Sequence, residues 1–127
     1  MQDIFNKIVT REIPAYIIWE SDTHLAFLDL NPIQPGHTLV IPKKQIGYIF
    51  DMDNEDYTKL WLSAKEVALI LKDKLNPVRV AIAVEGFGVS HTHIHLVPVN
   101  AENELNPELA KPADKKYLEE MQMSLLA

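Results

Sequence analysis

The segment HTHIHLVP (91–98) holds three of the five histidines of this chain, at every second position. In a β-strand, successive side chains point to opposite faces of the sheet. The segment therefore predicts a strand with three imidazoles on one face, while Ile94 and Leu96 pack into the core on the other. The three histidines are His91, His93 and His95.

The preceding segment VRVAIAV (78–84) also alternates, with Val80 and Ile82 on one face and Ala81 and Ala83 on the other. The glycine-bearing stretch EGFGVS (85–90) predicts a hairpin connection to the histidine segment. Two small side chains beside a neighbouring strand leave room for a cavity next to the imidazoles. Ordinary alanine packing in a tight sheet explains them equally well.

The remaining elements complete an α+β fold. Apolar residues at every third or fourth position predict a long helix over 54–75, and TLVIP (38–42) predicts a buried strand. Apolar runs on either side of a turn cluster at 20–23 predict a further hairpin. We expect one antiparallel sheet of about five strands, crossed by the long helix. A short helix near 3–9 and an amphipathic helix from about 114 lie outside this sheet.

Composition excludes several classes of protein. The 12 Lys and Arg against 18 Asp and Glu give a formal charge of −6, which argues against binding of a nucleic acid polymer. The absence of cysteine excludes disulfides, cysteine-bound zinc and thiol nucleophiles. No apolar run approaches the ~18 residues of a membrane span. A cytoplasmic protein of one domain is the expectation.

Three explanations of the histidine row remain open. A structural role explains most single histidines but not three in phase, since each protonation would oppose the next. Zinc binding suits imidazoles, but the outer pair stand roughly 13 Å apart on an ideal strand, so His37 would have to supplement two of them. Nucleophilic attack on phosphorus needs a neutral imidazole, and a cluster with pKa values near neutrality would supply neutral and charged rings together.

The histidine segment resembles the signature of the histidine triad (HIT) family, His-φ-His-φ-His-φ-φ with φ apolar, and Thr92 is the one departure. The segments IFNKIVTREIPA (4–15) and AFLDLNPIQPGHTLVIPKK (26–44) follow in the order of that family. The family comprises nucleotide-binding proteins, mostly hydrolases and transferases that act on a phosphorus linked to a nucleoside. The resemblance implies a HIT-like domain over 1–100 and a partly helical extension over 101–127 that packs on the same domain.

The resemblance also implies roles for four histidines. His93 would be the nucleophile, and His95 would contact the phosphate and stabilise charge in the transition state. His91 would hold the hydrogen-bond geometry of the site. His37, in PGHTLV, matches a further histidine that supports the triad.

The implied nucleoside pocket draws on two segments, and Asp29 would accept hydrogen bonds from the ribose hydroxyls. The loop EGFGVS is shorter than in many relatives, so that Ser90 and backbone amides near Gly86 and Gly88 are the local candidates for binding phosphate. Without the resemblance, the apolar members would be ordinary core residues. The implied pocket residues are Phe5, Ile8, Ile13, Phe27, Leu28, Asp29, Leu30, Gly88 and Ser90.

Together with the histidine row, the family resemblance implies a hydrolase of nucleoside monophosphate derivatives, of phosphoramidate type and with a purine nucleotide, working through a nucleotidyl-histidine intermediate without metal or other cofactor. The alternatives are a dinucleoside polyphosphate hydrolase, a zinc-dependent hydrolase and a non-catalytic nucleotide-binding module. Leu62, Leu69 and Ile70 lie off the main apolar stripe of the long helix and predict a homodimer. The C-terminal helix is expected either to pack on the same domain or to act as a lid or dimer clamp.

Overall fold

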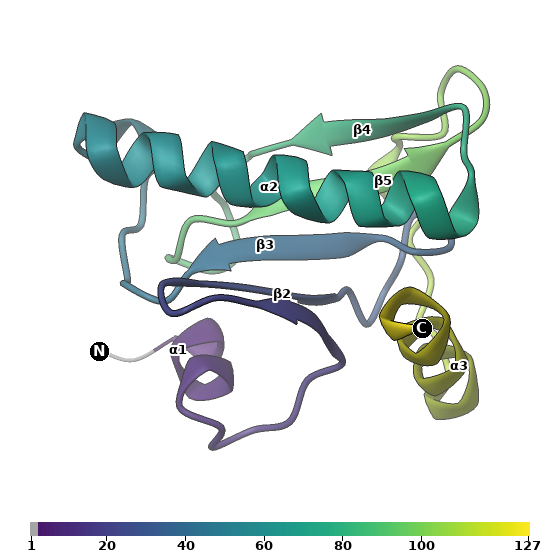
Figure 1. The fold of residues 1–127 in the computed structure, drawn as a ribbon, viewed down its shortest axis with the longest axis horizontal. Helices are drawn as coiled ribbons and strands as arrows, with labels where there is room; N and C mark the ends of the chain where they lie inside the picture. Colours follow the sequence, from purple (N-terminus) through teal and green to yellow (C-terminus); the bar gives the residue numbers. More distant parts are fainter. Residues whose placement is uncertain (1–2) are drawn as a thin grey trace.

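A computed structural model describes residues 3–127 and contains one antiparallel sheet in the order β1-β2-β3-β5-β4 (Figure 1). This confirms the predicted α+β class. The strands are β1 (Ile17–Glu20), β2 (His24–Leu28), β3 (Thr38–Pro42), β4 (Arg79–Ala83) and β5 (Ile94–Val99). The helices are α1 (Ile4–Val9), α2 (Asn54–Leu75) and α3 (Lys115–Leu126), with short 3-10 turns η1 (Ile49–Asp51) and η2 (Pro107–Leu109).

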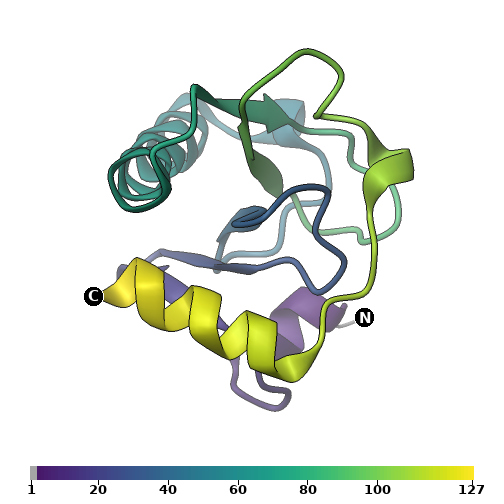
Figure 2. The ribbon, with the colours of Figure 1, turned by 90° about the vertical axis from the view of Figure 1, so that its right-hand side faces the viewer.

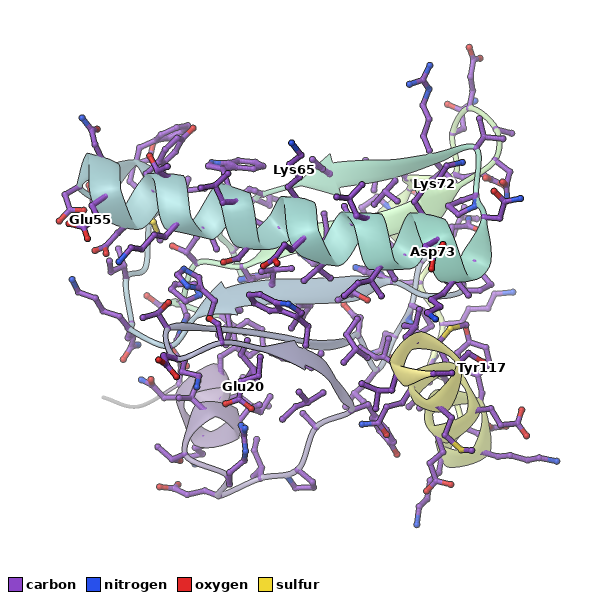
Figure 3. The ribbon with its side chains drawn as sticks, in the orientation of Figure 1. Glu20, Glu55, Lys65, Lys72, Asp73 and Tyr117 are labelled. Carbon is purple, nitrogen blue, oxygen red and sulfur yellow. The ribbon has the colours of Figure 1, made fainter. Side chains whose placement is uncertain are left out.

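Helix α2 crosses one face of the sheet, and it occupies the predicted range 54–75. The Asp53 side chain caps its first turn by accepting a hydrogen bond from the backbone N–H of Asp56, and Asn76 ends it in the left-handed conformation at φ 51°. Its inner face buries apolar side chains against the sheet, while charged residues such as Glu55 and Lys65 are spread along its exposed surface (Figure 3). The buried apolar residues are Leu60, Ala64, Val67 and Leu71, packed with Val40, Ile94 and Leu96.

The opposite face carries the shorter helix α1 and the segment 101–113, so that the sheet lies between them and α2 (Figure 2). A second apolar cluster forms here from Phe5, Ile8, Leu25, Phe27, Leu39 and Ile41. Strands β2 and β3 are buried at every position because both of their faces are covered. The α1 face therefore contains a second, smaller apolar core beside the imidazoles.

The predicted C-terminal helix is present as α3, and the Asp114 side chain caps it by accepting from the N–H of Tyr117. Leu118 and Leu125 are buried in the core shared with α2, and Tyr117 and Met121 pack against that core. Helix α3 contacts β1 and α2. Within residues 3–127, no helix is long and apolar enough to cross a membrane.

The histidine segment corrects one prediction. Regular strand pairing in β5 begins at Ile94 rather than at His91, and it continues through Pro98 to Val99. The backbone N–H and the hydroxyl of Thr92 both donate to the carbonyl of Ile46, at 2.7 and 2.6 Å. These two bonds hold the chain against the loop after β3 before it enters the sheet. On the other side of β5, the ladder with β4 reaches only as far as the pair Ala83 and His95.

Candidate active site

Four imidazoles lie on the α1 side of the sheet, at the junction of β3 and β5. The ring centroids of His93 and His95 are 5.0 Å apart, and those of His37 and His95 are 5.2 Å apart. His37 lies directly before β3 and is 58 residues from His95 in sequence. The structure thus brings His93, His95 and His37 together in one row, with His91 behind them.

His91 is fully buried and lies between two distant segments. Its Nε2 is 2.7 Å from the carbonyl oxygen of Pro42, which can only accept, so Nε2 carries a proton. Its Nδ1 lies 3.4 Å from Oδ1 of Asp3, whose Oδ2 accepts a hydrogen bond from Nε2 of Gln45 at 2.6 Å. Gln45 also donates to the carbonyl of Ser90 at 3.1 Å.

We call Asp3, Gln45 and His91 the polar clasp, because they join the start of α1 to the segment that carries the triad. Asp3 is also the N-cap of α1, where its Oδ1 accepts from the N–H of Asn6 at 2.8 Å. Sequence reasoning gave Asp3 and Gln45 no role in the site, since they are 42 residues apart and belong to no periodic pattern.

The hydrogen bond of His93 determines its tautomer. Its Nδ1 lies 2.8 Å from the carbonyl oxygen of His91, so Nδ1 carries the proton and donates. In the neutral ring, Nε2 then holds a free lone pair. The ring packs edge-on to Phe5 at a centroid distance of 5.1 Å. His93 can therefore present an oriented nucleophilic nitrogen.

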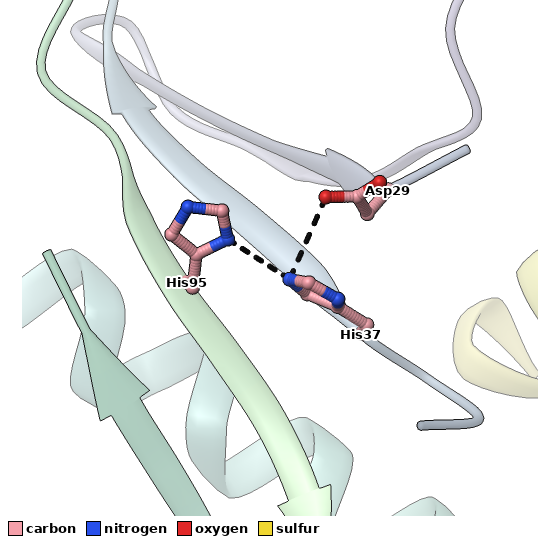
Figure 4. A group of neighbouring side chains, drawn as sticks. All are labelled: Asp29, His37 and His95. Atoms are coloured by element: carbon pink, nitrogen blue, oxygen red, sulfur yellow. Dashed lines mark hydrogen bonds and ion pairs between the residues drawn. The ribbon is translucent and has the colours of Figure 1, made fainter. Parts of the chain in front are cut away.

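A chain of hydrogen bonds likewise determines the tautomers of His37 and His95 (Figure 4). The backbone N–H of Ile33 donates to Nδ1 of His37 at 3.0 Å, so His37 carries its proton on Nε2. That nitrogen is 2.9 Å from Nδ1 of His95 and 3.5 Å from Oδ2 of Asp29. His95 accepts through Nδ1 and keeps its own proton on Nε2, where it can donate to a phosphate oxygen.

Burial keeps these rings neutral. Burial is the largest cause that lowers the pKa of His95 to about 4, and the adjacent His93 and His37 add to it. Burial also lowers the pKa of His37, although the nearby carboxylate of Asp29 opposes this. The expectation of pKa values near neutrality is therefore wrong for His95, whose ring is neutral at pH 7.

An apolar cavity of about 300 Å³ opens beside His93 and His95. Phe5 and Phe27 meet edge-to-face in its wall, with ring centroids 5.5 Å apart. We call it the first cavity. Its lining includes six of the residues that the resemblance implies for the nucleoside pocket, which are Phe5, Ile8, Phe27, Leu28, Asp29 and Leu30.

Three residues implied for that pocket do not line the first cavity. Ile13 packs against the α1 cluster, and Gly88 lies in an open loop at φ +83°. The carbonyl of Ser90 is held by Gln45. Val89 lines the cavity, whereas its neighbours Gly88 and Ser90 do not. The loop sequence alone does not reveal this difference. The other lining residues that sequence reasoning missed are Ile4, Pro14, Ala15, Asn31 and Leu39.

A second cavity, of about 440 Å³, adjoins the first one. Both are lined by Asp29 and His95, whereas His93 lines only the first cavity and His37 only the second. Asp29 is oriented at this junction because its Oδ1 accepts from the backbone N–H of Asn31 at 2.7 Å. Ala83 lines the second cavity, as predicted from its small side chain, whereas Ala81 lines neither cavity.

Asp29, His37 and His95 also present donor atoms within 4.8 Å of one another, the spacing of a possible metal site. Their protonation does not fit this use. To ligate through Nε2, His37 would need its proton on Nδ1, where it would face the N–H of Ile33. A metal would therefore have to break the hydrogen bond that orients the ring.

The fold and the site define an α+β domain in which an imidazole cluster on one sheet face borders an aromatic-lined cavity. A family model described as HIT domain matches residues 10–102. The chain belongs to the HIT family, whose members bind nucleotides and include hydrolases.

Individual relatives agree with this assignment. The bis(5'-adenosyl)-triphosphatase of Dictyostelium discoideum is 30% identical over 116 residues, which cover 84% of this chain and 78% of the relative. A Hit-like protein from Bartonella henselae, solved with an unknown ligand, superposes with a TM-score of 0.88 at 29% identity, covering 98% and 94% of the two chains. A zinc-bound histidine triad protein from Mycobacterium smegmatis superposes with a TM-score of 0.80 at 26% identity, covering 96% and 91%.

Proposed function

We propose that this protein is a hydrolase that removes a leaving group from the phosphorus of nucleoside monophosphate derivatives, with purine phosphoramidates as its preferred substrates. One observation carries the proposal. The proton of His93 is engaged on Nδ1 by the carbonyl of His91, so that Nε2 is left as a lone-pair donor beside the N–H of His95 and the first cavity.

The first step would be nucleotidyl transfer to the enzyme. The lone pair on Nε2 of His93 forms a bond to phosphorus while the bond from phosphorus to the leaving nitrogen breaks. The leaving nitrogen keeps that electron pair and takes a proton from solvent. His95 donates its Nε2 proton as a hydrogen bond to a phosphoryl oxygen, and His37 holds His95 in the tautomer that can do so.

The second step would be hydrolysis of the nucleotidyl-histidine. A water oxygen bonds to phosphorus, the bond to Nε2 breaks, and its electron pair returns to His93. The water releases a proton to solvent, which balances the one taken up by the amine. The products are a nucleoside monophosphate and a free amine.

The base and the ribose of the nucleoside would contact different surfaces of the first cavity. The faces and edges of Phe5 and Phe27 suit a planar base. The carboxylate of Asp29, next to the imidazoles, suits the adjacent ribose hydroxyls as an acceptor. The proposal assigns to the site residues the roles that the family resemblance implies, except for Ile13, Gly88 and Ser90, which lie off the first cavity.

The test is to incubate the protein with adenosine 5'-phosphoramidate and to follow AMP release, with mass spectrometry of the acid-sensitive adduct after rapid mixing. We expect an added nucleotidyl group on His93, and we expect His93→Ala to lose turnover while it still binds AMP. His24→Gln is the matched control, because His24 is a buried histidine close to Asp56 and Lys59 of α2 and outside the cluster. Turnover by His93→Ala would remove the mechanism.

A second candidate is hydrolysis of dinucleoside polyphosphates, which the Dictyostelium relative favours by its name. The same assay with diadenosine triphosphate separates the two substrate classes. A zinc-dependent reaction would lose activity on treatment with a chelator, whereas histidine-based transfer would keep it. Tight AMP binding without turnover of any compound would identify a binding module.

The quaternary state belongs to the same proposal. Leu62 and Leu69 are 59% and 58% exposed on α2, while Ile70 is partly buried. Burial of these leucines against a second copy would account for a homodimer. Light scattering at micromolar concentration is expected to give twice the chain mass, and a monomer mass would contradict it. A cytoplasmic location stays a prediction.

A further inference from the structure

The second cavity lies where a departing group would go. Phosphoryl transfer places the attacking and leaving atoms on opposite sides of phosphorus. His93 borders only the first cavity, His95 borders both, and His37 borders only the second. A phosphate held at His95 and attacked by His93 therefore directs its leaving group into the second cavity.

The outer wall of the second cavity comes from a segment beyond the family match at 10–102. Leu105, Pro107 and Ala110 line it, and Leu105 remains 36% exposed despite its apolar side chain. The segment lies on the same side of the sheet as α1 (Figure 2). This chain thus supplies an apolar wall through its own C-terminal region.

Hydrogen bonds hold that wall at both ends. The side chain of Gln34 donates to the carbonyl of Glu104 at 3.2 Å, and the Glu104 carboxylate accepts from the N–H of Ala101 at 3.0 Å. At the other end, the N–H of Ala113 donates to the carbonyl of Leu30 at 3.0 Å. The wall is therefore anchored to the loop that carries Asp29 and is present before any ligand arrives.

The charges that line the second cavity are of one sign. Asp29 and Glu85 contribute carboxylates, and none of the residues that line it is a lysine or arginine. Its imidazoles, His37 and His95, are held neutral by burial, which lowers the pKa of both. A second phosphate group would meet two carboxylates with no cation to offset them.

From this geometry we propose that the second cavity is a leaving-group subsite that accepts an amine with an apolar arm, neutral or cationic at its far end, and disfavours anionic leaving groups. The inference rests on the proposed function and names its substrate class. The apolar arm would lie along Leu105 and Pro107, and a cationic end would lie near Glu85 at the exposed rim.

The experiment compares three adenosine 5'-phosphoramidates that share the nucleotide and differ at the end of a four-carbon amine, which is a methyl, an ammonium or a carboxylate. We expect kcat/KM for the carboxylate compound to be lower than for the ammonium compound by roughly tenfold or more, the effect of about 1.4 kcal/mol of charge repulsion. Glu85→Lys should reverse or abolish this ratio. Glu66→Lys, an exposed position on α2, is the matched charge control and should leave it unchanged.

A second variant tests the apolar wall. Leu105→Trp should fill part of the cavity and lower kcat/KM for the three alkyl compounds relative to that for unsubstituted adenosine 5'-phosphoramidate. If the wild type hydrolyses all compounds equally and neither Glu85→Lys nor Leu105→Trp changes the pattern, the subsite is wrong and the proposed function stands.

Absence of turnover with every compound would instead remove the proposed function. Calorimetric binding of the same three compounds then decides the subsite independently. Weaker binding of the carboxylate compound, restored by Glu85→Lys, supports the proposed subsite. Equal affinities for the three compounds overturn it.

Discussion

The two faces of the sheet differ in how completely a helix covers them. On the α2 face, a helix of 22 residues buries Leu60, Val67 and Leu71 completely. On the other face, α1 has only six residues and covers part of the sheet, so imidazoles and two cavities occupy the rest. A long amphipathic helix seals its face with apolar contacts, whereas a short one leaves room for polar groups that can meet a ligand.

One strand contributes to both faces. In β5, Ile94 and Leu96 belong to the α2 core, and His95 between them points to the cavities. Because the side-chain period of a strand is two, a register slip of one residue would put the imidazole into the apolar core. The pairing of Leu39 with His95 and of Thr38 with Leu96 holds the register.

The largest expected effect on stability lies on the α2 face. Leu71→Ala removes a fully buried side chain and should lower the free energy of unfolding by about 2–5 kcal/mol, measured by urea denaturation. The specific activity of the remaining folded protein should be unchanged, since Leu71 lines neither cavity of the active-site face. Lost activity in the folded fraction would show that the two faces are coupled.

His37→Ala should have the opposite profile. It removes the N–H that orients His95, so kcat/KM for a phosphoramidate should fall roughly 10- to 100-fold, as for other residues that hold a reactive group in place. Urea denaturation should show a smaller change than for Leu71→Ala. His24→Gln is the control, and equal losses of activity in both variants would argue against a specific role for His37.

The pH dependence of stability should also distinguish the faces. The pKa of His95 is about 4 in the folded protein and close to 6.5 when unfolded, so between these values the unfolded chain binds more protons. Stability should therefore fall as the pH drops from 6.5 to 4, by about 1–2 kcal/mol after allowance for solvent at this partly open site. Denaturation of His95→Asn across the same range should show a shallower slope, and an unchanged slope would assign the effect elsewhere.

The smallest expected effect concerns the polar clasp. Asp3→Asn keeps the shape of the side chain but replaces one of the two oxygens that accept from Asn6 and from Gln45, so the polar clasp loosens and kcat should fall by about tenfold or less. KM should change little, because Asp3 does not line either cavity. Asp22→Asn, on an exposed turn, is the matched control. A change in KM alone would indicate that α1 moves against the nucleoside.

Local patterns determined much of this protein. The apolar period and the capping residues Asp53 and Asn76 define α2 to the residue, because helix periodicity and end chemistry are properties of neighbouring positions. The alternation of 91–98 put the three imidazoles on the face opposite Ile94 and Leu96. The HIT family signature in the same segment could be recognised without any structure.

Tertiary structure determined the tautomers of the histidines and the residue at which β5 begins. The tautomer of His37 depends on the N–H of Ile33, and that of His91 on the carbonyl of Pro42. The start of β5 at Ile94 depends on the carbonyl of Ile46, which holds Thr92 outside the ladder. These backbone groups belong to distant segments, where any residue type would present the same carbonyl and any residue other than proline the same N–H. Sequence therefore located the imidazoles, and only the packed chain determined which nitrogen of each carries the proton.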